Sequence, residues 1–475
     1  MLPAPAGMTQ AAWRVTAVTL LMAIWWITEA IPIPATALLP IALYPVLGVM
    51  KSQDAAAPYA NHLIYLFMGG FLLAVTMERW NLHRRIALHT IALVGTSPPR
   101  MILGFMVATG LLSMWVSNTA TTMMMVPIGM AVIDQAEEES RQRQNFARCL
   151  MLGIAYAASI GGIATIIGTP PNTVMAGMVE KMFGVEIGFA RWMLLGLPLA
   201  VLMLILCWLL LTRVLFPLKD VQLAGSADVL AQELTALGKI SRQEKLVLVV
   251  AALAAFFWVS RGFLNKAPLV NEIWPNFAHV HDATIAIFCA LLLFVIPTDF
   301  KRGEFLLDWQ TAVKIPWGVM VLFGGGLAIA AGFAKTGLAV YVAGQFSSLS
   351  GASMVIFVGA VVLATVFLTE LTSNTATATL LVPIMGSAAV AMGIHPFATI
   401  VSATLAASFA FMLPVATPPN AVVFGSGRVA IKDMAKAGFW LNLLGTVVIT
   451  LFVSYAMPAL WGIDLRVTPA WAKKG

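Results

Sequence analysis

Long apolar segments that carry few charges constrain this chain more than any other feature. The clearest segments are 15–28, 36–50, 192–211, 283–297, 317–334 and 439–461. A helix of about 20 apolar residues crosses a bilayer, so these runs predict spanning helices, and the shorter ones need tilting or flanking residues. Only 10% of the 475 residues are charged, whereas a soluble domain carries about 25%. We predict an all-α polytopic membrane protein, because a membrane β-barrel would show alternating segments of about ten residues instead.

The first apolar segment follows Arg14 and contains WWITEAIPIPA. It is too long and too aromatic for a signal-peptide core, so we expect a retained helix. The net charge is +7, and Lys and Arg gather in polar loops, as in membrane proteins with basic cytoplasmic loops. We therefore expect a lipid bilayer as partner and no nucleic acid. Three scattered cysteines, Cys149, Cys207 and Cys289, predict buried thiols rather than a metal site or a disulfide framework.

Three sequence blocks occur twice, in the same order. SNTATTMMMVPI at 117–128 returns as SNTATATLLVPI at 373–384, with eight of twelve positions identical and an offset of 256. GTPPN at 168–172 returns as ATPPN at 416–420 with an offset of 248, and YLFMGGFLLA resembles VLFGGGLAIA. Three matched blocks predict two structural repeats. Repeats that meet at a central site are a feature of secondary transporters.

The repeat divides the chain into four parts. These are an N-terminal segment with the first helix at 1–35, a first repeat at 36–218, a polar inter-repeat linker at 219–245 and a second repeat at 246–475. The helix-favouring residues of the linker predict a surface helix. Each repeat has room for five or six spans, and an inverted arrangement requires an odd number, which periodicity alone does not decide.

Both duplicated motifs lie where a membrane helix should break. The apolar arms beside Ser117 and Ser373 are each about 16 residues or shorter, which is short for a crossing and predicts a re-entrant hairpin with SNT at its tip. The paired prolines of the TPPN motifs remove backbone donors and interrupt a span near its middle. Irregular backbone at membrane depth is tolerated only where it is buried or lines a cavity. We expect the tips and breaks of both halves to share one cavity.

The side chains of these motifs offer neutral oxygens and hydrogen-bond donors. Interrupted helices add free carbonyl groups at one end and free N–H groups at the other. Hydroxyl, amide and carbonyl oxygens can hold a monovalent cation such as Na⁺, while N–H groups and hydroxyls can bind a carboxylate. No Arg or Lys lies in either motif, so a dianion would need cations beside it. The pattern predicts cation-coupled anion transport rather than uniport.

Glu370 lies three residues before Ser373, in LTELTSNTAT. An ionisable group at membrane depth is a functional candidate. Its counterpart in the first half is Met114, so we expect a structural role outside the repeated site. Proton transfer, or an ion pair with a residue such as Lys314 or Lys335, is the alternative.

Other ionisable groups predict no catalytic centre. Glu29 ends the first predicted helix, where we expect a structural or interfacial role. The histidines of HVHD at 279–282 are expected to be solvated rather than to bind a metal. Because the sequence contains no HExxH, P-loop or nucleophile–base motif with a convincing context, we do not expect an enzyme.

At the paired motifs the sequence resembles the divalent-anion/sodium symporter (DASS) family, the INDY-type di- and tricarboxylate carriers. Segments in the family's order carry the resemblance: WWITEAIPIPATALLP (25–40), SNTATTMMMVP (117–127), GGIATIIGTPPN (161–172), LTELTSNTATATLLVP (368–383) and LPVATPPNAVVFGSG (413–427). The resemblance covers essentially the whole chain. It implies an inverted-repeat transporter of about eleven transmembrane helices with two re-entrant hairpins, a scaffold plus an elevator-type transport domain, and a homodimer.

The resemblance also implies ligands. Each half would supply oxygens to one Na⁺: Ser113, Ser117, Asn118 and the Gly168 carbonyl in the first, and Thr369, Ser373, Asn374 and the Ala416 carbonyl in the second. The substrate carboxylates would meet residues of both halves: Asn118, Thr119, Asn374 and Thr375, with Thr169, Pro170, Thr417 and Pro418 nearby. A four-residue spacing places the hydroxyls of Ser113 and Ser117, and those of Thr369 and Ser373, on one helix face.

From these features we expect a secondary active transporter of small dicarboxylates such as succinate, malate or fumarate. We expect it to be coupled to Na⁺ by an elevator mechanism and to lie in a bacterial cytoplasmic membrane. A dicarboxylate exchanger, or a carrier of citrate or of an oxyanion such as sulfate, on the same fold remains an alternative. An ion channel is a further one, although it would more often show a pore ring shared by subunits.

Overall fold

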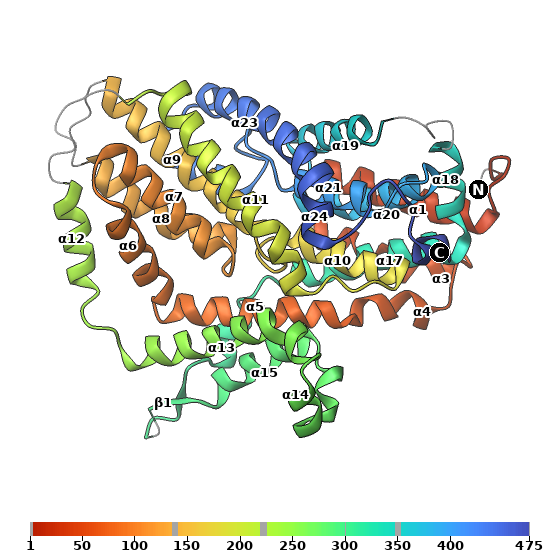
Figure 1. The fold of residues 1–475 in the computed structure, drawn as a ribbon, viewed down its shortest axis with the longest axis horizontal. Coiled ribbons are helices and arrows are strands. Elements are labelled where there is room, and N and C mark those ends of the chain that lie inside the picture. Colours follow the sequence, from red (N-terminus) through yellow and green to blue (C-terminus); the bar gives the residue numbers. More distant parts are fainter. Residues whose placement is uncertain (1–2, 135–140, 219–225, 300, 347–352, 475) are drawn as a thin grey trace.

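The computed structural model describes residues 3–134, 141–218, 226–299, 301–346 and 353–474, which are mostly helical (Figure 1). Among them, seven helical segments are long and apolar enough to cross a membrane, and four shorter helices are also apolar. The predicted polytopic helical class is thus confirmed. Two of these eleven helices, α19 and α20, are the arms of one hairpin, so the number of membrane crossings stays a prediction.

The described residues before the linker form eleven α-helices and two short helical segments. In chain order they are α1 (Gln10–Thr28), α2 (Ile33–Thr36), α3 (Leu39–Val46), α4 (Ser52–Ala56), η1 (Ala57–Ala60), α5 (His62–Arg79), α6 (Leu82–Val94), α7 (Pro98–Ser113), α8 (Asn118–Asp134), α9 (Arg141–Gly162), α10 (Pro170–Phe183), α11 (Phe189–Leu209) and the π-helical η2 (Leu210–Leu215).

Among its described residues the linker carries the helix α12 (Ser226–Ala236), which packs against α6 and α8. The predicted linker helix is thus present, while 219–225 lie outside the described residues. Arg84 pairs with Glu233 of α12, and Arg85 makes a two-point ion pair with Glu244, at 2.7 and 3.3 Å. These pairs tie the linker region to α6.

The described part of the second half is also helical, with one small β-hairpin. Its elements are α13 (Arg242–Leu264), α14 (Pro268–Ile273), η3 (Pro275–His279), α15 (Asp282–Val295), β1 (Pro297–Asp299), β2 (Glu304–Phe305), α16 (Trp309–Ala312), α17 (Trp317–Thr336), α18 (Leu338–Phe346), α19 (Met354–Thr369), α20 (Asn374–Ala391), α21 (Phe397–Ala407), α22 (Pro418–Gly425), α23 (Ile431–Leu451), the π-helical η5 (Phe452–Ala456), α24 (Met457–Trp461) and η6 (Ala470–Lys474). Strands β1 and β2 pair antiparallel.

The expected helix breaks are present at all four motif positions. Hairpins α7–α8 and α19–α20 turn at the SNT motifs, and the prolines of the TPPN motifs start α10 and α22. Proline is suited to the first turn of a helix because that turn leaves its N–H groups unpaired. The threonine before each proline pair, Thr169 or Thr417, has an extended backbone and acts as the N-cap residue.

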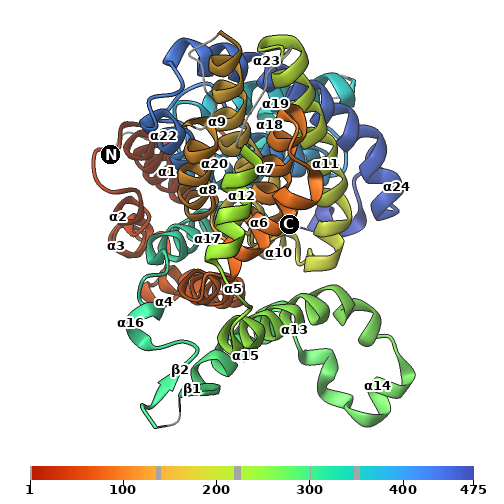
Figure 2. The ribbon, with the colours of Figure 1, turned by 90° about the vertical axis from the view of Figure 1, so that its left-hand side faces the viewer.

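Elements of the two halves pack across each other. Helix α10 of the first half packs on α20 and α21 of the second, and α22 of the second half packs on α8 and α9 of the first. Figure 2 shows α13, α14 and α15 in a layer beneath α5, with the hairpins and broken helices on its other side. Each half therefore contributes to the environment of the other half's motifs.

Two glycines bring α7 and α9 into backbone contact. A Cβ atom on Gly161 would lie 2.2 Å from the carbonyl oxygen of Gly110, a distance that no side chain could occupy. Ser113 is one turn beyond Gly110, and Ala158 is one turn before Gly161. The close approach therefore places the end of α7 against the carbonyl groups of α9.

Candidate functional site

In the first half, oxygen atoms from two helices and a helix break face one another. The hydroxyl of Ser113 lies 2.7 Å from the carbonyl oxygen of Ala158 and 2.5 Å from the inward-facing amide atom of Asn118. The same amide atom lies 3.2 Å from the carbonyl oxygen of Gly168 and 3.3 Å from that of Ala158. The end of α7, the start of α8, the body of α9 and the break before α10 thus meet at one point.

The Asn118 amide can face this cluster in two ways. With its nitrogen inward, it donates to the two carbonyl oxygens and to Ser113. With its oxygen inward, four oxygens face one another, and a cation among them would balance their negative partial charges. Such neutral oxygen donors suit a hard cation such as Na⁺. The first-half residues therefore fit the ion that the sequence predicts.

Two glycines leave room for the cluster. A Cβ atom on Gly162 would lie 2.9 Å from the Asn118 amide, and one on Gly168 would lie 2.5 Å from the carbonyl oxygen of Gly162. Both belong to GGIATIIGTPPN, so the motif contains more of the site than its hydroxyl and amide residues. We infer that glycine is required at both positions for steric reasons.

The second half repeats part of this arrangement. The Thr369 hydroxyl lies 2.8 Å from the amide oxygen of Asn374 and 2.8 Å from the carbonyl oxygen of Ala407. Thr369 and Asn374 thus correspond to Ser113 and Asn118 in position and in contact. In each half, a carbonyl group of a neighbouring helix also contacts the hydroxyl. This helix is α9 in the first half and α21 in the second.

The two predicted serines, Ser117 and Ser373, lie at the starts of α8 and α20. The hydroxyl oxygen of Ser117 accepts the N–H of Ala120 at 3.1 Å and so caps α8. Ser373 is the N-cap residue of α20. Within the described part of the chain, no side-chain hydrogen bond joins Ser373 or Ala416 to Thr369 or Asn374. In the second half a hydrogen bond joins two of the four predicted sodium ligands, Thr369 and Asn374, and the roles of Ser373 and of the Ala416 carbonyl stay predictions.

The predicted substrate residues lie at four helix N-termini. Thr119 and Thr375 are the second residues of α8 and α20, and Pro170 and Pro418 are the first residues of α10 and α22. The first turn of a helix has a positive partial charge, which favours an anion. At α10 and α22 the first two residues are prolines, which have no N–H to donate. Asn118 and Asn374 at two of these ends are half-buried, so they remain accessible to a ligand.

The asparagines of the TPPN motifs hold the broken helices, a role that the sequence analysis missed. The amide of Asn172 donates to the carbonyl oxygens of Thr165 at 2.8 Å and Ile163 at 3.3 Å. The amide of Asn420 donates to those of Leu413 at 3.0 Å and Ala410 at 3.1 Å. Both side chains are fully buried. An asparagine ends both copies of the motif, and this repetition was the signal that could have indicated their role.

The hydrogen bonds of Glu370 are consistent with the expected structural role. The alternative ion pairs with Lys314 or Lys335 are wrong. Its carboxylate accepts hydrogen bonds from backbone N–H groups of 411–413 and from Asn442. Lys335 instead pairs with Asp54 at 2.8 Å. Within the described residues, no ion pair joins Glu370 to Lys314.

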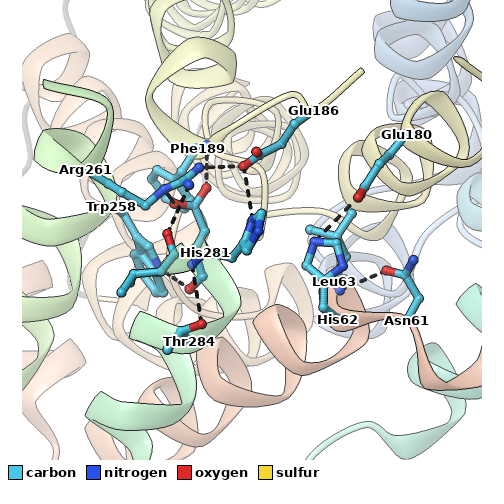
Figure 3. A network of polar contacts seen from close by, with 12 residues as sticks. Asn61, His62, Leu63, Glu180, Glu186, Phe189, Trp258, Arg261, His281 and Thr284 are labelled. Atoms are coloured by element: carbon cyan, nitrogen blue, oxygen red, sulfur yellow. Dashed lines mark hydrogen bonds and ion pairs between the residues drawn. The ribbon is translucent and has the colours of Figure 1, made fainter. Parts of the chain in front are cut away.

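A second polar network joins helices outside the motifs (Figure 3). Arg261 of α13 pairs with Asp282 at 2.7 Å and with Glu186, in the α10–α11 loop, at 2.5 Å. Asp282 also accepts the N–H of Phe189, the first residue of α11, at 2.8 Å. Asp282 belongs to HVHD, where only solvated histidines were expected. In the structure its side chain is buried.

Two histidines extend this network. His281 lies 3.7 Å from Glu186, and His62, at the start of α5, lies 3.7 Å from Glu180 near the end of α10. The two imidazole rings are 5.2 Å apart. Figure 3 shows Glu186 between Arg261 and His281, and Glu180 beside His62. The network therefore joins the α10–α11 region to α5, α13 and α15.

Sequence comparison relates the chain to known proteins over almost its full length. A family model described as the sodium:sulfate symporter transmembrane region matches residues 1–463. The sodium-dependent dicarboxylate transporter SdcS of Staphylococcus saprophyticus is 47% identical over 458 residues, covering 95% of this chain and 87% of the relative. The protein of the same name from Staphylococcus aureus strain USA300 is 46% identical over 459 residues, with the same coverage.

Solved structures of two transporters share the fold. The YdaH transporter of Alcanivorax borkumensis aligns with a TM-score of 0.58 at 16% identity, covering 94% of this chain and 98% of that one. MtrF of Neisseria gonorrhoeae aligns with a TM-score of 0.58 at 11% identity, covering 95% and 96%. At these identities the likeness concerns the fold alone.

Proposed function

This chain belongs to the sodium:sulfate symporter family, the divalent-anion/sodium symporters, and from that premise we propose that it is a Na⁺-coupled secondary transporter of small dicarboxylates. Succinate, malate and fumarate are the substrates we expect. Relatives 46–47% identical over 95% of the chain are named sodium-dependent dicarboxylate transporters. The observation that carries the proposal is the oxygen cluster of Ser113, Asn118, Ala158 and Gly168, because it matches the chemistry of a sodium ligand set.

Electrostatics explains why such a site would couple anion to cation. A dicarboxylate carries two negative charges, and neither the SNT nor the TPPN motifs contain a basic residue. Helix N-termini and hydroxyls stabilise only part of that charge. One Na⁺ in each half, bound by the two predicted ligand sets, would offset the rest. Substrate would then bind well only when sodium is present, which is the condition for symport.

We further propose that the two halves form an inverted repeat and that the protein works as an elevator. In this proposal the hairpins and broken helices move as a transport domain against a scaffold that includes α5, α13 and α15. The layered arrangement in Figure 2 supports this division. The homodimer, the bacterial cytoplasmic membrane and transport without chemical change of the substrate complete the proposal, on the basis of the family membership.

An inorganic oxyanion is the second candidate substrate, because the description of the matching family names sulfate. Exchange of two dicarboxylates is the second candidate mechanism. Both candidates use the same helix N-termini, so the residues alone do not separate them. They differ in what drives uptake and in which anion competes.

Uptake of radiolabelled succinate into proteoliposomes separates these functions. We expect saturable uptake that requires an inward Na⁺ gradient and that malate and fumarate inhibit more strongly than sulfate or citrate. Uptake that ignores Na⁺ but rises with internal succinate would replace symport by exchange. Absence of saturable uptake of any dicarboxylate, citrate or sulfate would overturn the substrate class.

A further inference from the structure

A cavity lined by three arginines lies away from the duplicated motifs, where four helices begin or end. Its volume is about 340 Å³, and small-ligand pockets begin near about 300 Å³. The end of α8, the start of α9 and the segment from the end of α22 to the first turn of α23 form its walls. Its charged lining residues are Arg143, Arg148, Arg428 and Asp433. We call this cavity the arginine pocket.

Ion pairs hold the three guanidinium groups around the pocket. Nε of Arg148 donates to Asp433 at 2.9 Å, and Nη2 of Arg428 donates to Asp134, the last residue of α8, at 2.5 Å. Arg143 lies 3.8 Å from the same Asp134 carboxylate. Three arginines face two aspartates, so these groups together carry a net positive charge. A bound anion would balance that charge.

Two of the arginines have further donors to offer. A guanidinium has five N–H donors. Arg148 uses its Nε for Asp433 and its Nη1 for Asn145 at 3.3 Å, and the side chain of Arg428 uses one N–H for Asp134. Within the described residues, neither side chain makes another hydrogen bond. The ion pairs therefore fix the position of these guanidinium groups without using all of their donors.

The start of α23 adds a positive helix end to the same wall. The helix has 21 residues and begins at Ile431, and no side-chain hydrogen bond caps it. The N-terminus of a helix has a positive partial charge and free backbone N–H groups. Guanidinium groups bind phosphate through paired hydrogen bonds, and helix N-termini bind it through backbone N–H groups. The pocket thus combines two kinds of group that bind phosphate.

The pocket lies where apolar helices end. A helical segment long enough to cross the membrane, Ile431–Trp461, begins beside it, and another, Phe189–Leu215, ends next to Phe216. The ring of Phe216 lies 5.9 Å from the guanidinium carbon of Arg148. Ile431 is 54% exposed, so apolar surface adjoins the basic pocket. Basic residues mark the cytoplasmic side of membrane proteins, and basic pockets between membrane helices there bind anionic lipid headgroups.

We propose that the arginine pocket is a binding site for a phosphate group, carried by an anionic phospholipid or by a soluble phosphate compound. Arg148 comes from the first half of the chain and Arg428 from the second. A phosphate bound to both joins helix ends of the two halves, so it should stabilise the folded protein. The pocket contains none of the residues predicted to bind Na⁺ or substrate, and the inference does not depend on the proposed function.

Thermal unfolding of the purified protein in an uncharged detergent tests the proposal, because a ligand that binds the folded state raises the unfolding temperature. The probes are inorganic phosphate, as its potassium salt, and a short-chain phosphatidylglycerol. A diacylglycerol of the same chain length is the control without phosphate. Na⁺ and dicarboxylates are left out, so that binding at the proposed transport site does not contribute.

We expect a saturable rise in the unfolding temperature with at least one phosphate probe and none with the diacylglycerol. A response to phosphatidylglycerol alone identifies a lipid as the source of the phosphate, and a response to inorganic phosphate shows that a soluble compound suffices. No response to either probe, or an equal response to the diacylglycerol, would overturn the inference and leave the proposed function standing.

Arg428→Gln locates the binding site. The side chains of Arg428 and its partner Asp134 are 37% and 52% exposed, so loss of this ion pair should cost little stability. We expect the variant to bind the responding probe about tenfold more weakly, the order expected for a lost charged hydrogen bond. Arg428→Lys keeps the charge without the paired donors and should weaken binding less. Arg143→Gln is a second variant and should act as Arg428→Gln does.

Arg213→Gln is the matched control. Arg213 lies in the last turn of η2, and it does not line the pocket. We expect this change to alter the affinity by less than about twofold. If Arg428→Gln and Arg143→Gln weaken binding no more than Arg213→Gln does, the probe binds to basic surface in general, and the assignment to the arginine pocket is wrong.

Discussion

At the scale of single residues, Asn118 and Asn374 occupy the same position of the two SNT motifs and contact equivalent hydroxyls, Ser113 and Thr369. Both are half-buried at helix starts. Replacing either by alanine removes an amide that the proposal assigns to both cation and carboxylate. We expect Asn118→Ala and Asn374→Ala each to abolish Na⁺-driven succinate uptake in proteoliposomes.

The same two variants should remain folded, because neither asparagine lies in the fully buried core. Gel filtration and an unchanged unfolding temperature check this. Normal uptake by both variants would show that the site assignment is wrong.

Side chains of the site could be predicted from the sequence better than its backbone groups. The family resemblance implied Ser113, its four-residue spacing from Ser117 supported that assignment, and the structure joins Ser113 to Asn118. The family resemblance implied the carbonyls of Gly168 and Ala416 but not that of Ala158, whose place in the cluster depends on the contact between α7 and α9. Ser117 shows why a residue type alone does not define a role. Its hydroxyl caps α8, and a serine before any helix can do the same, so its presence in the motif does not by itself identify a ligand.

His395, in the loop between α20 and α21, should make stability depend on pH. Burial, followed by the charge of Arg191, lowers the pKa of His395 to about 4. In the unfolded chain the imidazole gains its proton near pH 6.5, so between pH 6.5 and about 4 the unfolded state binds more protons. The free energy of unfolding therefore decreases as the pH falls through this range.

His395→Asn keeps an acceptor for the N–H of Phe397, which the imidazole accepts at 3.1 Å, and removes the titration. Between about pH 7.5 and about pH 5, the wild type should lose about 1 kcal/mol more than the variant, allowing for solvent screening. Thermal unfolding in detergent at the two pH values measures the difference. Identical losses in both proteins would contradict the assignment.

At the scale of elements, the helix breaks depend on the two motif asparagines as well as on the prolines. Asn172 donates to carbonyl oxygens of a break that is buried throughout, whereas the break before α22 is partly exposed, with Val415 85% exposed. Replacing the donor by a carboxylate turns the contact into repulsion. A buried polar group left unsatisfied costs about 1–3 kcal/mol, and a charged one more.

We therefore expect Asn172→Asp to destabilise the protein more than Asn420→Asp, by at least about 1 kcal/mol. Chemical denaturation or thermal unfolding of the two purified variants measures the difference. Asn172→Ala and Asn420→Ala serve as controls for the loss of the donor without the added charge. Equal destabilisation by the two aspartates would mean that burial of the break does not determine the cost.

Helix breaks were predictable where proline pairs or polar triplets interrupt an apolar run, but helix lengths were not. The apolar segment 36–50 contains one short helix, α3, instead of a spanning helix, because Pro40 and Pro45 restrict its backbone and Gly48 adopts a positive φ of 68°. The helix in the segment 283–297 ends before the apolar run does, and Pro297 begins β1. Apolar composition predicts burial or membrane contact, while the local backbone limits decide how far a helix continues.

At the scale of the whole molecule, the repeat indicates which segments are alike but not which ones pack together. The cross-packing of α10 on α20 and α21, and of α22 on α8 and α9, joins the halves through contacts between residues far apart in sequence. Such contacts depend on how side chains of both surfaces fit, which a single sequence does not reveal. Duplicated motifs alone therefore predicted a shared site, and the structure supplies the packing that joins the halves.

The network in Figure 3 provides a test of the elevator proposal, because it joins the α10–α11 region to α5, α13 and α15. If α10 moves with the hairpins while α5 stays fixed, the contact between His62 and Glu180 must open in each transport cycle. Exposed ion pairs contribute little stability, about 0–1 kcal/mol each, so such a contact could open readily. A covalent link at the same place should stop the cycle.

We expect His62→Cys with Glu180→Cys, after replacement of Cys149, Cys207 and Cys289, to lose Na⁺-driven uptake when a short, reducible bifunctional thiol reagent is added. Reduction should restore uptake. Arg148→Cys with Asp433→Cys provides the matched control, since these residues pair at 2.9 Å between α9 and α23. We assign α23 to the moving unit because its Gly438 contacts the backbone of the break before α22. Cross-linking there should leave uptake largely unchanged. Full uptake after complete cross-linking of the first pair would mean that α10 and α5 do not separate during transport, and the elevator proposal would fail.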